Sequence, residues 1–329
     1  MKSLRETFLS KVAQTSKFPL GLEIEKAEGI FLFDKEGKKY FDFISGISVS
    51  NLGHNNLKII SAIKDQLDKH LHLMVYGEYI QSIQVKFAEM LTKFLPEKLN
   101  SVYFTNSGAE AIEGAMKLSK RFSGRTEIVS FRNAYHGSTQ GALSIIGGEE
   151  FKNSFRPLLP DTRLLEFNSV KQLEEITNKT ACVIIEVIQG EAGVIPSEKK
   201  FLQKLREKCN ETKTLLIFDE IQTGMGRTGK LFAFEHYGVI PDVICLAKAV
   251  GGGMPLGAFV SSKAIMDSLT NDPVLGHITT FGGHLVSCAA GKAALEILTD
   301  SDLIESVQKK EELFTSILTH KKIKSFGLV

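Results

Sequence analysis

The amino-acid sequence predicts an α/β protein built on a mostly parallel sheet, either as two domains or as one large domain with an appendage. Three observations lead to this fold class. Short apolar runs alternate with helical stretches over most of the chain, and an apolar–polar alternation near the N-terminus marks a small β element. The length of 329 residues is enough for a large buried core.

The sheet is predicted by short apolar runs, rich in β-branched residues, that are bounded by glycine or charge. Continuous runs of this kind are typical of parallel strands that are covered on both faces. The runs are VYF near 102, EIVSF near 127, ACVIIEV at 181, TLLIFD at 214, DVICLA at 242 and AFVSS at 258.

The other elements follow from hydrophobic periodicity and turn residues. Residues 22–43 alternate around Asp34-Lys35-Glu36-Gly37, which predicts a β-hairpin. The final residues, KIKSFGLV, indicate the start of another strand. Apolar residues at helical spacing predict helices over 59–67, 80–93, 283–298 and 302–318.

Composition and charge exclude several classes of function. The formal net charge is +2 and the basic residues are scattered, so nucleic acid is not an expected partner. No stretch has the length and apolarity of a membrane span or a signal peptide. The four cysteines lie far apart without a CxxC pair, so we expect them to be reduced thiols in the core of a cytoplasmic protein. They are Cys182, Cys209, Cys245 and Cys288. We expect no metal site.

The candidate functional residues lie where the predicted strands end, because ligands of open α/β sheets bind at the carboxyl ends of the strands. After VYF, the small residues Ser107, Gly108 and Ala109 lead into a helix. The N–H groups at such a helix start suit a phosphate, although most turns of this kind are only helix caps.

Two charged residues follow runs that should be buried on both faces. Asp219 ends TLLIFD, and a salt bridge to a neighbour such as Arg227 would be its commoner explanation. Lys248 follows DVICLA and precedes three glycines that would let another group approach closely. Burial lowers the pKa of an amine and makes it a usable nucleophile.

Taken together, six motifs resemble one family. SGAEA, NAYHG, EVIQGE, FDEIQTGMGRTG, LAKAVGGGMPLGA and TTFGGH look like the successive motifs of class III pyridoxal-phosphate aminotransferases of the ornithine and acetylornithine type. The resemblance runs from about residue 20 to the last residue. It implies the type I aminotransferase fold: a large cofactor domain over 51–300, a small-domain segment over 1–50, and the start of a C-terminal small domain over 301–329.

The resemblance assigns the catalytic pair and the ring contacts. Lys248 matches the lysine that holds pyridoxal 5′-phosphate as a Schiff base and shuttles the proton, and Asp219 matches the carboxylate that faces the pyridine nitrogen. Tyr135 matches the aromatic that stacks on the ring, and Gln222 matches the contact to the phenolic oxygen. Without the motifs, Tyr135 would more often be a core residue.

The resemblance also assigns the phosphate site. Ser107, Gly108 and Ala109 match the backbone that cradles the phosphate, and Thr280 matches a hydroxyl contributed by a partner subunit. A homodimer with shared active sites is therefore expected. His136 belongs to the cofactor motif either as a direct contact or as a residue that packs nearby.

Two departures from the family concern the substrate. Ser138 stands where an arginine usually binds a substrate carboxylate, and serine cannot make that bidentate contact. The sequence therefore argues against glutamate or 2-oxoglutarate as a partner substrate. Arg132 is close in sequence, but its position on a strand does not place its side chain in the pocket. Glu191 is present without its usual C-terminal arginine. Either the chain is an incomplete copy of a longer protein, which we favour, or the enzyme is altered. Thr279 is placed with Ser138 and Glu191 on the substrate side.

The leading functional hypothesis is amino-group transfer from an amino donor, ornithine-like or another ω-amino compound, to a 2-oxo acid by a ping-pong mechanism. The same cofactor would also serve a mutase, a racemase or a decarboxylase. A cofactor-binding protein without catalysis is the alternative from another class, and the buried trio of Lys248, Asp219 and Gln222 argues against it.

Overall fold

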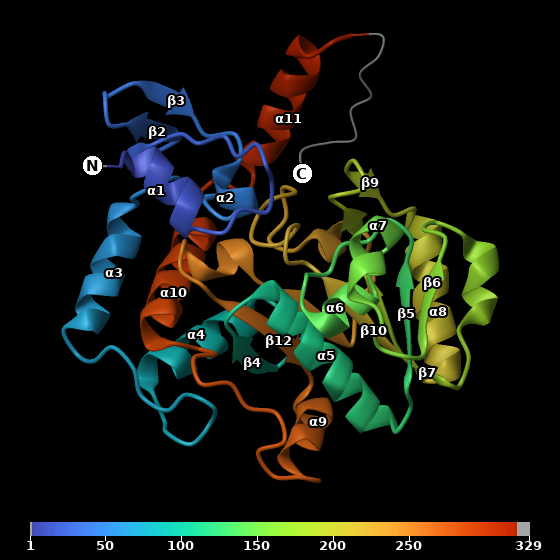
Figure 1. The fold of residues 1–329 in the computed structure, drawn as a ribbon. Coiled ribbons are helices and arrows are strands. Elements are labelled where there is room, and N and C mark those ends of the chain that lie inside the picture. Colours follow the sequence, from blue (N-terminus) through green and yellow to red (C-terminus); the bar gives the residue numbers. More distant parts are fainter. Residues whose placement is uncertain (1, 321–329) are drawn as a thin grey trace.

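The structure is a computed structural model that describes residues 2–320. Within this range, seven strands form one central sheet in the order β4-β12-β11-β10-β7-β5-β6 (Figure 1). All neighbouring pairs are parallel except those of β12, which runs antiparallel to both β11 and β4. The strands are β4 Ser101–Thr105, β5 Glu127–Phe131, β6 Thr162–Leu165, β7 Thr180–Ile185, β10 Leu215–Asp219, β11 Val243–Leu246 and β12 Gly257–Ser261.

The sheet is buried on both faces, as its continuous apolar runs predict. In β10, Leu216 and Phe218 belong to one apolar cluster, and Leu215 and Ile217 belong to a second cluster on the opposite face. The first cluster includes side chains of α4, α8 and α10, and the second includes those of α5. The helices are α1 Leu4–Lys11, α2 Ser45–Ser48, α3 Leu57–Leu67, α4 Ser82–Lys93, α5 Gly108–Ser123, α6 Gln140–Ser144, α7 Glu149–Lys152, α8 Lys199–Thr212, α9 Lys263–Met266, α10 Leu285–Thr299 and α11 Ser306–Ile317.

A small antiparallel sheet lies near the N-terminus, beside α1 and apart from the central sheet (Figure 1). It consists of β1 Ile24–Glu28, β2 Phe31–Asp34 and β3 Lys39–Phe41. The predicted turn joins β2 to β3: the Gly37 N–H donates to the Asp34 carbonyl at 2.9 Å, and Gly37 has a φ of +80°. The predicted hairpin is confirmed, and β1 extends it. A further pair, β8 Ile188–Gln189 and β9 Ile195–Pro196, is also antiparallel.

The four predicted helices correspond to α3, α4, α10 and α11, with ends that differ by up to four residues. The six predicted strands are present, but β6 was not predicted, because it is a four-residue edge strand that is only partly buried. The strand expected at KIKSFGLV lies outside the described residues. No helix in residues 2–320 is long and apolar enough to cross a membrane.

Candidate active site

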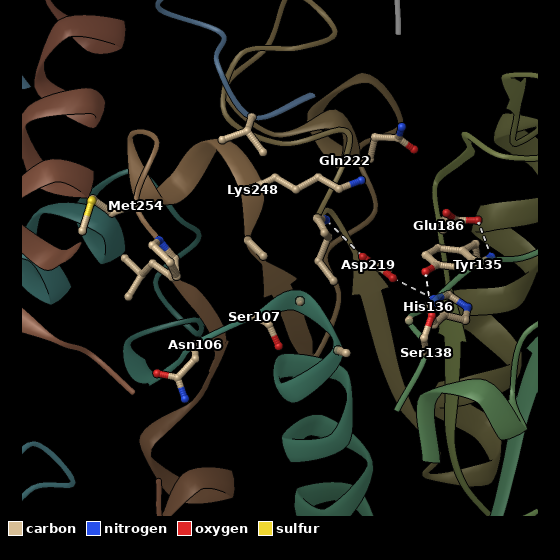
Figure 2. A pocket seen from close by; sticks show the side chains of 18 of the residues that line it. Asn106, Ser107, Tyr135, His136, Ser138, Glu186, Asp219, Gln222, Lys248 and Met254 are labelled. Carbon is tan, nitrogen blue, oxygen red and sulfur yellow. Dashed lines mark hydrogen bonds and ion pairs between the residues drawn. The ribbon is translucent and has the colours of Figure 1, made fainter. Parts of the chain in front are cut away.

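A cavity of about 420 Å³ opens where β4, β7, β10 and β11 end. These four strands point the same way, so the residues that follow them meet at one edge of the sheet. Figure 2 shows Lys248, Asp219, Tyr135 and Gln222 around this cavity. Residues predicted from three separate motifs are therefore brought together.

Asp219 is a buried carboxylate at the end of β10, with 4% of its surface exposed. Its Oδ2 atom lies 2.7 Å from Nδ1 of His136, and its Oδ1 atom accepts the Ile221 N–H at 3.0 Å. The other ring nitrogen of His136 lies 3.2 Å from the Ser130 hydroxyl. This arrangement suits a histidine that donates to the carboxylate and accepts from the serine. The partner of Asp219 is thus His136, and the salt bridge to Arg227 is wrong.

Lys248 follows β11 and extends into the cavity toward Gln222 (Figure 2). Burial lowers the pKa of its amine, while the carboxylates of Asp219 and Glu191 act in the opposite direction. Its backbone has a φ of +52°, a left-handed conformation that costs a non-glycine residue about 1 kcal/mol. A short 3₁₀ helix, Lys248–Gly251, begins at this residue.

Tyr135 and Gln222 both line the cavity. The Tyr135 hydroxyl lies 3.1 Å from the Ser138 hydroxyl, and the residue as a whole is 41% exposed. Gln222 lies against Gly190, where an added Cβ would come within 1.9 Å of the Gln222 side-chain oxygen. A glycine at position 190 therefore leaves room for the Gln222 amide.

The start of α5 forms another part of the cavity wall. The Ser107 side chain caps the helix by accepting the Glu110 N–H at 3.2 Å. Gly108 and Ala109 line the cavity, and N–H groups in the first turn of a helix have no partner within the helix. Such N–H groups, together with the helix dipole, favour an anion. A Cβ at Gly257 would lie 2.3 Å from the Ser107 carbonyl oxygen, so this turn packs tightly on β12.

Glu186 is a residue of the site that the sequence reasoning missed. It follows β7, lines the cavity and is 6% exposed. Burial, reinforced by the nearby Asp219 carboxylate, raises the pKa of Glu186 well above its usual value. Its hydrogen bond from the Tyr135 N–H is long, at 3.4 Å. The available signal was a glutamate at the end of the apolar run ACVIIEV.

The predicted substrate-side residues are not all in this cavity. Ser138 lines it, whereas Glu191 lines a neighbouring cavity of about 790 Å³ that shares Tyr135 and Lys248 with the first. Arg132 forms an ion pair with Glu166 at 2.6 Å and lines neither cavity.

Thr279 and Thr280 are also absent from the residues that line the first cavity. Thr279 accepts a hydrogen bond from Asn106 at 3.0 Å, and Thr280 is exposed. These two threonines therefore lie on a loop beside the site, and their assigned roles stay predictions.

The residues present fit pyridoxal 5′-phosphate. The α5 start suits its phosphate, the buried carboxylate of Asp219 suits a protonated ring nitrogen, and the Lys248 amine suits its aldehyde carbon. The volume is within the range of small-molecule sites, about 300–1,000 Å³. Fold and site together define a pyridoxal-phosphate enzyme.

Comparison with known proteins agrees with this definition. Residues 12–327 match the family described as aminotransferase class III. The chain is 39% identical to an acetylornithine aminotransferase of Clostridium acetobutylicum over 91% of this chain and 78% of that protein. It is 40% identical to a [LysW]-aminoadipate semialdehyde/glutamate semialdehyde transaminase of Sulfolobus acidocaldarius, over 91% of this chain and 76% of the relative.

Solved structures show the same likeness. The ornithine aminotransferase of Toxoplasma gondii superposes with a TM-score of 0.88 at 28% identity, covering 97% of this chain and 77% of that one. A pyridoxal-phosphate-bound amine transaminase from an uncultivated Pseudomonas species gives a TM-score of 0.87 at 30% identity, covering 94% and 78%.

The chain belongs to the class III aminotransferases. It is a pyridoxal-phosphate-dependent enzyme of the type I fold that transfers an amino group between an amino donor and a 2-oxo acid. This confirms the predicted fold class, cofactor and reaction. The alternatives of other pyridoxal-phosphate chemistry or a non-catalytic homologue gain no support from these relatives.

Proposed function

We propose that Lys248 binds the cofactor covalently and moves the proton during transamination. The observation that carries this proposal is that Lys248 and the buried Asp219–His136 pair line one cavity. When bound, the cofactor withdraws electrons from the substrate carbon that carries the amino group. Nζ of Lys248, whose pKa is lowered by burial, is then suited to take the proton from that carbon and return it.

The remaining cavity residues orient the cofactor in this proposal. Asp219, fixed by His136, faces the ring nitrogen and keeps it protonated. Tyr135 stacks on the ring, and Gln222 contacts its phenolic oxygen. The α5 start, with Ser107, Gly108 and Ala109, holds the phosphate.

We further propose a homodimer in which Thr280 contributes to the partner's phosphate site. Thr280 is exposed and does not line the cavity of its own chain. Large apolar side chains are exposed in several segments, as expected of a surface that another copy covers. They include Phe18, Leu20, Phe43, Leu71, Ile80, Val274 and Ile278.

The substrates are proposed from the cavity walls. Ser138 leaves this position without a cation for a second carboxylate, which supports an oxo-acid acceptor with a single carboxylate, such as pyruvate, over 2-oxoglutarate. An ω-amino donor is supported by the relatives named for acetylornithine and ornithine. Glu191 and Thr279 are proposed on the substrate side.

The domain division and the cellular location are also proposals. The separate β1–β3 sheet supports a small-domain segment over 1–50. The cofactor domain over 51–300 and the start of a C-terminal small domain over 301–329 complete the proposed division. All four cysteines are free and buried, which supports a reducing compartment such as the cytoplasm.

Borohydride trapping tests the central proposal. Protein loaded with pyridoxal 5′-phosphate and reduced with borohydride should carry the cofactor on Lys248, as read by peptide mass spectrometry. Lys248→Ala should carry none and should lose activity by at least about 10²-fold. Lys200→Ala, on the exposed side of α8, serves as the matched control. Cofactor trapped on a different lysine of the unmodified protein would show that the assignment is wrong.

A further inference from the structure

The loop over 271–283 connects the α9 region to α10, and it is fastened to β4 and α5. The Tyr103 hydroxyl donates to the His277 carbonyl at 2.9 Å, and Nζ of Lys117 lies 3.0 Å from Nδ1 of His277. Asn106 donates to the Thr279 hydroxyl at 3.0 Å. Three residues that lie before and within α5 thus hold the loop at two positions, 277 and 279.

The protonation states fit this fastening. Burial, helped by the positive charge of Lys117, lowers the pKa of His277 to about 4, while Glu110 acts weakly in the opposite direction. At neutral pH the imidazole is therefore neutral, and its Nδ1 accepts from the Lys117 ammonium. The rings of Tyr103, Phe259 and His277 pack together in one cluster: the centroid of Tyr103 lies 4.9 Å from that of Phe259 and 5.1 Å from that of His277, and the latter two are 6.1 Å apart.

Apolar side chains of the same loop are exposed, although the Phe281 ring also lies 4.6 Å from that of His72. Val274 is 72% exposed, and Leu275, Ile278 and Phe281 are 50 to 53% exposed. Thr280 is exposed among them. A loop that is held by hydrogen bonds at two positions and exposes apolar side chains is suited to contact a second copy of the chain.

We propose that Tyr103, Asn106 and Lys117 are positioning residues for the partner subunit's active site: they hold loop 271–283 so that Thr280 reaches the phosphate bound in the other subunit. This inference rests on the shared dimer proposed above. The same helix, α5, begins with Gly108 and Ala109, which line the cavity of its own chain. One helix therefore fixes both the phosphate cradle of its own site and the loop that it lends to the other.

A mixed dimer separates effects on the two sites. Two chains with different affinity tags are co-expressed, and one carries Lys248→Ala, so that only the other chain can trap cofactor with borohydride. The double variant Tyr103→Phe/Lys117→Met is placed in either chain, and trapped cofactor is measured against the concentration of pyridoxal 5′-phosphate. Tyr103→Phe keeps the ring contacts, and Lys117→Met keeps most of the side-chain length. Asn106 is left unchanged because it also lines the cavity of its own chain.

The expected result depends on which chain carries the double variant. In the Lys248→Ala chain, it should raise the cofactor concentration for half-trapping by about tenfold at the intact site, the effect of roughly one lost hydrogen bond. In the chain with intact Lys248, the change should stay within about twofold. Lys120→Met, on the same helix, is the matched control and should have no effect in either chain.

Several outcomes would overturn the inference. An equal effect from both placements, or an effect only from the chain with intact Lys248, would show that the contacts serve their own site or the general stability of the fold. Thr280→Val in the Lys248→Ala chain tests the proposal of a shared site separately from the positioning role. If that variant has no effect, or if no dimer forms, the shared site itself is wrong. If it weakens trapping and the double variant does not, only the positioning role is wrong.

Discussion

Nδ1 of His136 lies 2.7 Å from Oδ2 of Asp219, although the two residues are 83 positions apart in the sequence. Both side chains are buried, and Ser130 fixes the far side of the imidazole. The carboxylate at the floor of the site is therefore held in one orientation by residues of a different strand end. Asp219 supplies the negative charge, whereas His136 and Ser130, which come from a distant part of the sequence, fix the orientation of the carboxylate.

Replacing His136 should weaken catalysis without removing the carboxylate. His136→Leu is expected to lower kcat/KM by about 10- to 100-fold, the effect of losing one hydrogen bond to a charged group. His136→Gln, whose amide can donate to Asp219, should recover part of the loss. Steady-state kinetics with saturating cofactor checks this, and equal activity of His136→Leu and the unmodified enzyme would contradict it.

Ser138→Arg should change the choice of acceptor. A guanidinium at this position of the cavity wall can bind a second carboxylate with two hydrogen bonds. The ratio of kcat/KM for 2-oxoglutarate to that for pyruvate is expected to rise by about 10- to 100-fold. Ser138→Met controls for side-chain size. If it produces the same shift, the charge of the arginine is not responsible.

Glu186 should make the stability of the cofactor-free protein depend on pH. Burial and the Asp219 charge raise its pKa in the folded state, so the folded state holds a proton that the unfolded chain releases above about pH 4.3. Stability contributed at low pH is lost as the pH rises from that value toward the folded-state pKa, at a rate of up to about 1.4 kcal/mol per pH unit.

Glu186→Gln should remove this dependence. Urea unfolding of both proteins from pH 4 to 8 is expected to show the variant gaining stability relative to the unmodified protein as the pH rises. Other titrating groups occur in both proteins and cancel in the difference. A constant difference across this range would mean that Glu186 titrates normally in the folded state.

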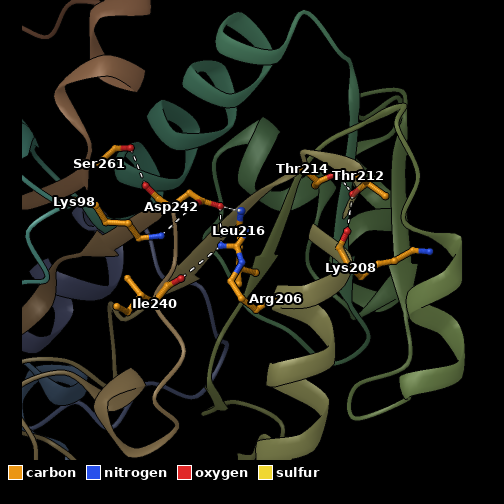
Figure 3. Close-up of polar contacts among 9 residues, drawn as sticks. All are labelled: Lys98, Arg206, Lys208, Thr212, Thr214, Leu216, Ile240, Asp242 and Ser261. Carbon is orange, nitrogen blue, oxygen red and sulfur yellow. Dashed lines mark hydrogen bonds and ion pairs between the residues drawn. The ribbon is translucent and has the colours of Figure 1, made fainter. Parts of the chain in front are cut away.

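Asp242, which precedes β11 at the end of the sheet opposite to the cavity, should affect stability alone. Its Oδ2 atom accepts from the Leu216 N–H and from Arg206, both at 2.8 Å, and its carbonyl accepts from the Ser261 hydroxyl (Figure 3). Asp242→Ala leaves the largely buried Arg206 without its carboxylate partner and should cost about 3–5 kcal/mol in unfolding free energy. Cofactor affinity at a temperature where the variant is folded should not change, and a loss there would contradict the separation of the two ends.

The sequence identified site residues where a charged side chain follows a fully buried strand. Asp219 and Lys248 stood out because each follows an apolar run that forms a fully buried strand. Glu186 follows a similar run, β7, and the same rule applied to it would have found it. His136 as the partner of Asp219 had no local signal, because the contact depends on how β5 and β10 are arranged in the sheet.

Strand direction and strand edges were harder to predict. The run that forms β12 looks like its parallel neighbours, because an apolar run carries no information on direction. β6 has intermediate burial and an exposed Arg163, so it lacks the continuous apolar pattern of the central strands. The predicted hairpin was correct since its turn is specified locally by Asp34 and Gly37.

The position of β4 bears on the order in which the protein can be completed during synthesis. Its only neighbour in the described sheet is β12, so Phe104 pairs with Ala258, far along the chain. Until β12 has been synthesised and has emerged from the ribosome, β4 has no strand with which to pair. We therefore expect that the start of α5, which directly follows β4, is not yet positioned beside β10 and β11. A nascent chain that stops before residue 257 is therefore expected to emerge without a phosphate cradle, however well its earlier strands have formed.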